Sequence, residues 1–536
     1  MRLARLGSFH PTRLSFMPTL LRHIRAGGWR FDRPLWRIGA DGTGLALYRL
    51  SRGAQSYTLA AFAHDLPAEQ RSDRVIATAW DATFTLFDGM PTEKDIERLA
   101  AQVPLQEAGR LEASELVLSR ANRSIRLWSH VVERLAAGRQ PDLEEIAGVG
   151  YLMRTTAVYG SSKFGTADRT RLMGRPLLDG PFRAEMLAVW LIRAFSLDLV
   201  EDMARAANPA AARLAPELRR RLGIGNSTGL GMAPFLVTHP ALLHRWIAAR
   251  ETALARVRGL GHSAGWEAFR TALEDARRNA ALWQSAHPYQ KAKLADLTRD
   301  LDLIAAQPRP QTHQPWDSLW RWGAANLSLE GQEQLFALLL APHGAEIDDL
   351  DGEMTANETE AARIDGAMDI ADLRNLICRN YAWALGFDAE ARAANARFWY
   401  VSEEKLEPRL GQRFEEPGAS REQPLAVARD IARLAAALED TEGPVAGFLL
   451  RQPQHRHALR RVQLSASRPY AEIRDNLIRA EMLPIDLLRA KLAMFGATRF
   501  DPRSDRWLRI TMFQDAPLPQ EFAADQTIGN HAALTG

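Results

Sequence analysis

The sequence predicts an α+β protein that is predominantly α-helical, in which a small N-terminal antiparallel β-meander is attached to a large helical body. Residues 29–90 contain short runs of aromatic and β-branched side chains separated by turn residues, which is typical of antiparallel strands. From residue 91 onward, apolar side chains mostly recur at steps of three and four, which indicates helices that bury one face. A chain of 536 residues exceeds the size at which a single core stops growing, so we expect more than one domain.

The composition is ordinary for a globular protein and argues against some classes of function. The 68 basic and 65 acidic residues leave a net charge of +3, which makes nucleic acid an unlikely partner. The single cysteine, Cys378, cannot form an internal disulfide or a thiolate metal cluster. Since no run of about 18 apolar residues occurs, we expect no membrane span and a cytoplasmic protein.

The first two segments differ in charge and in turn chemistry. Residues 1–28 are rich in arginine and contain no acid, so we predict a basic N-terminal arm that docks on a second subunit of a homo-oligomer. Residues 29–90 form the predicted meander, in which the pairs Asp41-Gly42 and Arg52-Gly53 favour hairpin turns.

Residues 91–306 are predicted to form a helical domain with two glycine-rich loops, residues 159–165 and 223–231. One of its long helices is expected over residues 111–135. Another is expected over residues 143–156, because its apolar side chains recur at steps of three and four. The positions that carry this stripe are Leu143, Ile146, Val149, Leu152, Met153 and Thr156.

The loop at residues 159–165 is the leading candidate for a functional site. Two glycines bracket two hydroxyl side chains, and a loop that leaves a buried helix is a frequent place for function. The surrounding cations would make any hollow here electropositive, so its expected ligand is an anion. We expect Arg154 and Lys163 to bind a carboxylate or phosphate and Tyr159 to exchange a proton. The candidate residues of this region are Arg154, Tyr159, Ser161, Ser162, Lys163 and Arg169. The same pattern also fits a structural turn whose cations lie on a solvated face.

A second candidate is the loop at residues 223–231, which holds four glycines in nine residues. Such loops let backbone N–H groups approach a ligand, and Asn226, Ser227 and Thr228 would add neutral donors. Tight packing between helices explains the glycines as well. The spacing is not that of a dinucleotide-binding fingerprint.

The remaining chain is predicted to hold a second helical region and a strand. Residues 307–318 form a proline-rich linker, residues 319–500 the second helical region, and residues 501–516 a strand that returns to the meander. Residues 517–536 are expected to form a flexible tail. Within the second region, Glu403 and Glu404 follow an aromatic pair, and burial there could raise a carboxylate pKa enough for general-base catalysis. An exposed helix with ordinary ion pairs is the alternative.

Together these patterns predict a metal-independent enzyme that uses acid–base chemistry on a small anionic metabolite bearing a carboxylate or phosphate. We expect a non-redox lyase, hydrolase or transferase without a cofactor. The alternative is a non-catalytic helical scaffold or partner-binding protein, and RNA binding through arginine-rich helices is a third possibility. The enzyme hypothesis requires Lys163, Asn226 and one carboxylate to meet in one pocket, whereas a scaffold leaves them dispersed.

Overall fold

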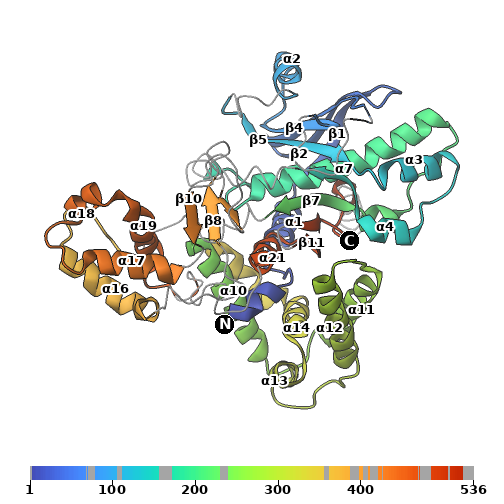
Figure 1. Cartoon of the computed structure of the whole chain (residues 1–536). Coiled ribbons are helices and arrows are strands. Elements are labelled where there is room, and N and C mark those ends of the chain that lie inside the picture. The colour runs from blue at the N-terminus through green and yellow to red at the C-terminus, as the bar shows by residue number, and fades with distance from the viewer. Residues whose placement is uncertain are drawn as a thin grey trace.

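The structure is a computed structural model, and it describes most of the chain. The described residues are 3–67, 69, 79–104, 112–155, 172–229, 240–354, 361–386, 398–401, 408–410, 421–424, 427–468, 470, 484–504 and 507–522. They form a large sheet, a layer of helices against it, and a smaller helical unit at the left of Figure 1.

The central element is a mixed sheet, to which nine strands of the described part contribute in the order β1-β2-β3-β4-β5-β6-β7-β12-β11. Neighbouring strands are antiparallel except β6 and β7, which are parallel. The N-terminal meander is antiparallel as predicted, but the prediction of a small sheet was wrong, because the later strands extend it. The strands are β1 (Arg30–Ile38), β2 (Gly44–Arg52), β3 (Gln55–Ala63), β4 (Ala82–Asp88), β5 (Glu115–Arg123), β6 (Tyr151–Thr155), β7 (Gly223–Gly229), β11 (Arg499–Ser504) and β12 (Trp507–Met512).

Helices cover both faces of the sheet, which explains why several strands lack a polar face. The long helix α7 (Arg183–Ala207) contacts β2 through β7 and is buried over most of its length. On the opposite face, α2 (Glu93–Gln102) helps to enclose a second core with Leu47, Phe62 and Leu99. A strand buried on both faces reads as a continuous apolar run, which periodicity alone does not distinguish from a helix.

The predicted helix over residues 143–156 was wrong in its second half, which is a strand buried on both faces. Helix α4 (Leu143–Val149) ends at Gly150, which has a φ of 83° and donates its N–H to the carbonyl of Ile146. The chain then continues as β6, whose residues are all buried. Helices often end at a glycine in the left-handed backbone conformation. Gly150 therefore ends α4, and the apolar positions that follow it belong to β6.

Two further predictions were also wrong. The helix expected over residues 111–135 is strand β5 followed by α3 (Trp128–Ala136). The glycine-rich loop expected at residues 223–231 is strand β7 as far as Gly229. Its glycines allow close packing, since a Cβ on Gly225 would meet the ring of Tyr151.

The N-terminal segment is part of the core rather than a free arm. The 3-10 helix η1 (Leu3–Ser8) and helix α1 (Phe16–Ala26) bury Leu6, Leu20 and Ile24. Arg5 donates through Nε to Oε1 of Glu333 at 2.6 Å. Docking of this arm on a second subunit therefore loses its basis, and the oligomeric state stays a prediction.

The helical layer packs below the sheet in Figure 1 and includes the predicted linker. Trp316 and Ile304, from opposite sides of residues 307–318, lie buried in the same core. The linker thus joins two helices of one packed body. The elements of this layer are α8 (Pro216–Arg221), α10 (Pro240–Arg258), α11 (Trp266–Leu282), α12 (Pro288–Ala305), α13 (Pro315–Asn326), α14 (Leu329–Leu340), α15 (Gly344–Ile347), η5 (Asp348–Met354) and α21 (Pro484–Phe495).

The smaller helical unit has a hydrophobic core of its own, built around Ile377, Tyr381, Leu434, Phe448 and Val462. Strands β8 (Phe398–Val401), β9 (Pro408–Leu410) and β10 (Arg421–Pro424) form a separate three-stranded sheet, so residues 319–500 are not helical throughout. The helices of the unit are α16 (Ile370–Leu385), α17 (Val427–Leu438), α18 (Val445–Arg451), η6 (Pro453–His455) and α19 (Arg456–Ser465).

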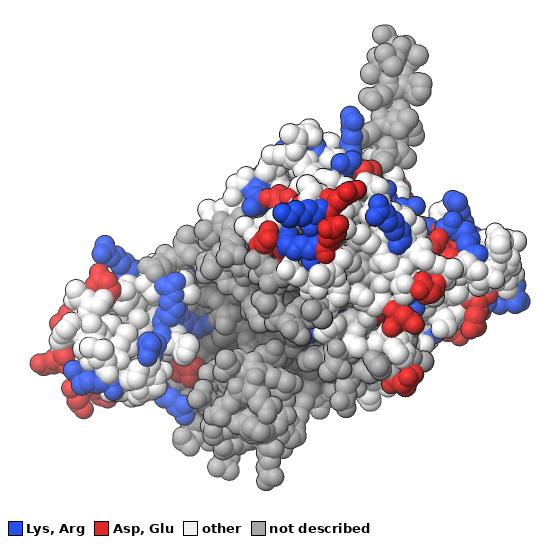
Figure 2. Space-filling model, turned by 90° about the horizontal axis from the view of Figure 1, so that it is seen from above, with Lys and Arg blue, Asp and Glu red and all other residues white. Residues whose placement is uncertain are grey.

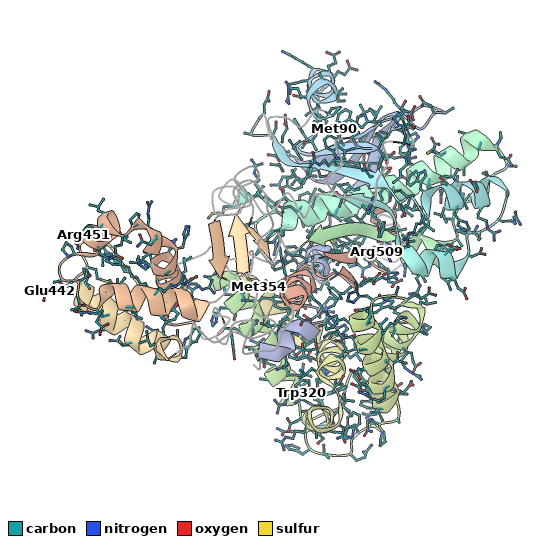
Figure 3. The ribbon with its side chains drawn as sticks, viewed as in Figure 1. Met90, Trp320, Met354, Glu442, Arg451 and Arg509 are labelled. Carbon is teal, nitrogen blue, oxygen red and sulfur yellow. The ribbon has the colours of Figure 1, made fainter. Side chains whose placement is uncertain are left out.

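The C-terminal part adds the hairpin β11–β12 to the sheet, whereas a single strand completing the meander was expected. Strand β12 pairs with β7, and β11 adds a further strand at that edge, so the return strand does not reach the meander directly. Figure 3 labels Arg509, which lies on β12, the strand between β7 and the edge strand β11. The start of the predicted tail is packed, since Trp190 donates to the carbonyl of Pro517 and Phe522 is buried. Within the described helices, none is long and apolar enough to cross a membrane.

Candidate functional site

Most residues of the first predicted site cannot be placed. The predicted residues that lie outside the described part are Tyr159, Ser161, Ser162, Lys163, Arg169, Glu403 and Glu404. The predicted convergence of Lys163, Asn226 and a carboxylate therefore stays a prediction.

The other predicted residues lie on neighbouring strands. Arg154 is buried on β6, opposite Asn122 of β5 and Gly225 of β7. Asn226, Ser227 and Thr228 lie on β7, where they pair with Ile510, Arg509 and Leu508 of β12, respectively. Strand pairing thus places Arg154 beside the strand that carries Asn226. It does not support a role for β7 as a loop of free backbone donors, because its backbone is paired with β12.

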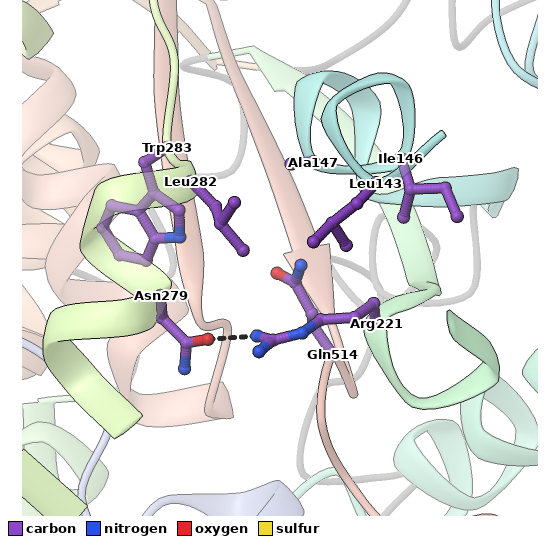
Figure 4. Close-up of a pocket in the computed structure, with 8 residues that line it drawn as sticks. All are labelled: Leu143, Ile146, Ala147, Arg221, Asn279, Leu282, Trp283 and Gln514. Atoms are coloured by element: carbon purple, nitrogen blue, oxygen red, sulfur yellow. Dashed lines mark hydrogen bonds between the residues drawn. The ribbon is translucent and has the colours of Figure 1, made fainter. Parts of the chain in front are cut away.

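A small pocket lies beside these strands, between α4, α8 and α11 (Figure 4). Arg221 donates across it to the amide oxygen of Asn279. The cavity volume is about 10 Å³, which is room for a single water molecule and not for a metabolite. The residues that line it are Leu143, Ile146, Ala147, Arg221, Asn279, Leu282, Trp283 and Gln514.

The wall of this pocket is held by two buried arginines of the β11–β12 hairpin. Arg499 donates to the backbone carbonyls of Ala147, Gly148 and Gln284. Arg509 donates to Oδ2 of Asp501 at 2.8 Å. Burial lowers the pKa of Arg499 to about 10. These cations are already engaged with carbonyls and a carboxylate, so we assign them a structural role.

A larger groove lies between β1, α7, α8 and the C-terminal segment. Its volume is about 550 Å³, within the range of about 300–1,000 Å³ that small-molecule sites occupy. Four arginines and two carboxylates line it, which leaves a net charge of +2. The residues that line this groove, called the arginine groove below, are Phe31, Arg33, Asp198, Glu201, Arg205, Arg213, Leu214, Arg219, Leu518 and Gln520.

The two carboxylates of the arginine groove orient two of its arginines. Asp198 and Glu201 lie one turn apart on α7. Arg219 bridges them, with Nη1 at 2.6 Å from Oε1 of Glu201 and Nη2 at 3.3 Å from Oδ1 of Asp198. Arg33 donates to the other oxygen of Asp198 at 2.9 Å and lies over the ring of Trp36 at 4.7 Å. Both arginines are therefore fixed in position before a ligand arrives.

The same contacts make Asp198 a poor general base. The buried hydroxyl of Tyr48 donates to Oδ2 of Asp198 at 2.8 Å, in addition to the two arginines. Burial, and then the charge of Asp198, raise the pKa of Tyr48 well above its ordinary value. Tyr48 thus stays protonated and acts as a hydrogen-bond donor to the carboxylate.

The other two arginines of the groove are available to a ligand. The exposed side chain of Arg213 makes no ion pair or hydrogen bond with any described residue. Arg205, also exposed, forms an ion pair with Asp202 at 3.7 Å. Gln520 contributes a buried amide oxygen that no described group donates to. The groove therefore combines two fixed cations, a third that pairs with Asp202, the unengaged Arg213 and an amide oxygen without a described donor.

Sequence reasoning did not find the arginine groove. Its residues come from positions 31 to 520, and only the folded sheet brings them together. The one local signal was the run Arg219-Arg220-Arg221, which stands shortly after Arg213.

Comparison with known proteins adds no family to this description. Family models, curated proteins and solved structures give no match to the chain. The site is therefore interpreted from its own geometry.

Proposed function

We propose that the protein binds a small anionic metabolite, bearing a carboxylate or phosphate, in the arginine groove. Two observations together support this proposal. The residues that line the groove of about 550 Å³ carry a net charge of +2. One of them, Arg213, has a guanidinium that no described residue engages. A guanidinium offers two parallel N–H donors, which match the two oxygens of a carboxylate or phosphate.

The arrangement of the groove supports a ligand of metabolite size rather than a free ion. Arg33 and Arg219 are held by Asp198 and Glu201 on one wall, whereas Arg213 has no described ion-pair partner. Cations at several points favour an anion with more than one charged group. Phe31 and Leu518 provide an apolar wall for its carbon skeleton.

Acid–base catalysis on this anion stays a prediction. The residues expected to perform it, Tyr159, Lys163, Glu403 and Glu404, lie outside the described part of the chain. The two carboxylates of the arginine groove accept hydrogen bonds from arginines and so orient these cations. The proposal therefore concerns binding, and it holds for an enzyme or for a non-catalytic receptor of the same anion.

The test is a thermal-unfolding screen of the protein against dicarboxylates, tricarboxylates and phosphate esters, repeated on Arg213→Gln. A ligand at about 100 times its Kd stabilises the protein by roughly 2.7 kcal/mol, which the melting temperature reports. We expect the wild type to be stabilised by at least one of these anions, and Arg213→Gln to lose most of that shift.

The matched control is Arg278→Gln, because Arg278 is an exposed arginine on α11 that does not line the groove. This variant should respond to the same anion as the wild type. Equal loss in both variants would indicate a general charge effect. A hit that survives in Arg213→Gln, or no hit in the wild type, would reject the arginine groove as the binding site.

A further inference from the structure

A buried arginine on α7, Arg193, joins two walls of the arginine groove. Helix α8 contributes Arg219 to the groove. The residues that follow β12, 513–522 and called the C-terminal segment below, contribute Leu518 and Gln520. Arg193 is fully buried and is not among the described residues that line the groove. Its contacts are a better guide than surface charge, since basic and acidic side chains lie interspersed on the face that Figure 2 shows.

The guanidinium of Arg193 donates hydrogen bonds to four backbone carbonyls. Nε donates to Leu222 at 2.7 Å, and Nη2 donates to Arg220 at 2.9 Å and to Arg219 at 3.3 Å. These carbonyls lie at the end of α8, where the last carbonyls of a helix have no partner within the helix. Nη1 donates to Ala516 of the C-terminal segment at 2.8 Å. One side chain therefore caps α8 and attaches the C-terminal segment to it.

The C-terminal segment begins with an unfavourable backbone conformation. Phe513 and Asp515 have φ of 57° and 61°, in the left-handed region that a side chain as bulky as Phe rarely adopts. Such residues persist where the surrounding structure holds them in place. The N–H of Asp515 donates to the carbonyl of Arg220 at 2.8 Å, and Arg193 holds the carbonyl of Ala516. The course of the segment is therefore imposed by α7 and α8 and not by local preference.

The side chain at position 193 has to be arginine to make this set of contacts. A guanidinium offers several N–H donors in a planar fork, whereas the ammonium of lysine is a single point at the end of a flexible chain. Burial lowers the pKa of Arg193 to about 9, so its charge persists at neutral pH. Lysine at this position would keep the charge but would not span both chain segments.

We propose that Arg193 is the positioning residue of the arginine groove, and that it fixes Arg219 and the C-terminal segment in the relative positions that an anion requires. Helix α7 also carries Asp198 and Glu201, which hold the guanidinium of Arg219. The backbone of Arg219 is held through Arg193, so one helix fixes both ends of this residue. The inference rests on the proposed function, because it concerns the same groove, but its first measurement needs no ligand.

The first measurement is hydrogen exchange followed by mass spectrometry of the full-length protein without added anions, for the wild type and Arg193→Lys. We expect exchange to be about tenfold faster in residues 213–222 and in the C-terminal segment together, since a hydrogen bond to a charged group favours the closed state by about that factor. Exchange in α16 and α17, which belong to the separate core, should not change.

The matched control is Arg250→Lys. Arg250 is as fully buried as Arg193, but it lies on α10 and pairs with Glu333, and it is not among the described residues that line the groove. This variant also replaces a buried guanidinium by an ammonium, so it should lower the melting temperature without faster exchange in the two walls. Equal acceleration of both walls in the two variants would indicate a general loss of stability and would overturn the inference.

The second measurement is the affinity for citrate, a tricarboxylate, by isothermal titration calorimetry. Arg193→Lys should bind citrate about tenfold more weakly than the wild type, which is the value of one hydrogen bond to a charged group, although Arg193 touches no ligand. Arg250→Lys should bind as the wild type does. Equal affinity of Arg193→Lys and the wild type would overturn the inference and leave the proposed function intact. A wild type that binds no anion would reject the proposed function, and the exchange of the two walls would then decide the role of Arg193.

A second variant, Glu521→Ala, tests the same attachment if Arg193→Lys does not fold. Glu521 is partly exposed, accepts the N–H of Leu518 at 2.9 Å and pairs with Arg220 of α8 at 3.0 Å. Its removal leaves no buried charge without a partner. We expect faster exchange in the C-terminal segment and weaker citrate binding. Unchanged exchange in this segment would show that its position does not depend on α8, which would overturn the inference.

Discussion

Nη2 of Arg250 lies 2.6 Å from Oε2 of Glu333, and both side chains are fully buried. Three aromatic rings surround the guanidinium, with centroids at 4.1 Å for Phe9, 4.7 Å for Trp246 and 4.3 Å for Phe336. The second oxygen of Glu333 accepts a hydrogen bond from Arg5. One carboxylate thus pairs with two arginines from separate segments and joins the N-terminal segment to α10 and α14.

The first prediction concerns this carboxylate. Glu333→Gln keeps the size of the side chain but leaves the Arg250 charge buried without compensation, so we expect a loss of about 3–5 kcal/mol in the free energy of unfolding. Urea unfolding followed by circular dichroism measures it. The control is Glu251→Gln, whose partly exposed carboxylate lies 3.3 Å from Arg5. That change should cost no more than about 1 kcal/mol, and equal costs for the two variants would contradict the assignment.

A second prediction concerns acid stability. Burial lowers the pKa of His10 below its ordinary value of 6.5, despite the hydrogen bond of 2.8 Å to Glu330. Just below pH 6.5 the unfolded chain therefore binds more protons than the folded one, and stability falls as the pH falls. Burial would raise the pKa of Glu330, but Arg489 and Lys293 outweigh it and hold the pKa below 4.5. The contribution of Glu330 to the free energy of unfolding is therefore fully present above pH 4.5 and decreases as the pH falls below that value.

The measurement is the free energy of unfolding between pH 7.5 and pH 3.5, within about a unit of those two ordinary values, for the wild type and His10→Asn. We expect the wild type to lose stability in two stages on acidification. His10→Asn should lack the first stage and keep the second. A variant curve parallel to that of the wild type between pH 6.5 and 4.5 would show that His10 does not carry the first stage.

The sequence predicts local elements well where one side of an element is polar. The hairpin turn at Asp41-Gly42 is present, with φ of 77° at Gly42, and Gly53 has a positive φ at the second predicted turn. The prediction failed at Tyr151–Thr155, where all five residues are buried. Burial on both faces depends on α7 and on the C-terminal hairpin, which lie far away in sequence, so no local pattern reports it.

The site was harder to predict than the fold. Arg154 lies on the strand next to the one that carries Asn226, although Arg154 was expected in a helix and Asn226 in a loop. The arginine groove depends on contacts such as Arg219 with Asp198, which the sheet and α7 bring together. Sequence spacing alone does not encode such contacts.

The third prediction tests the glycine that divides α4 from β6. Gly150 has a φ of 83°, and an added Cβ would lie 2.9 Å from Oγ1 of Thr511. Gly150→Ala should therefore cost about 1–3 kcal/mol of unfolding free energy, from backbone strain and this contact. Gly148, inside α4, has nothing within 4 Å of an added Cβ. Gly148→Ala should be neutral or stabilising by up to about 1 kcal/mol, and the opposite order of the two variants would refute this account.

The fourth prediction tests whether the smaller helical unit unfolds separately from the large body. Phe448 is fully buried in the core of this unit, and Leu450, two residues later on α18, is 85% exposed. Phe448→Ala should remove about 3–5 kcal/mol from the stability of the unit, because it leaves a cavity, while Leu450→Ala should change it by less than about 0.5 kcal/mol.

Hydrogen exchange followed by mass spectrometry measures the stability of the smaller unit and of the large body separately. In Phe448→Ala we expect faster exchange in α16, α17, α18 and α19 and unchanged exchange in α7 and the strands of the large sheet, because the two cores do not share residues. Faster exchange in α7 as well would mean that the two cores unfold as one cooperative unit.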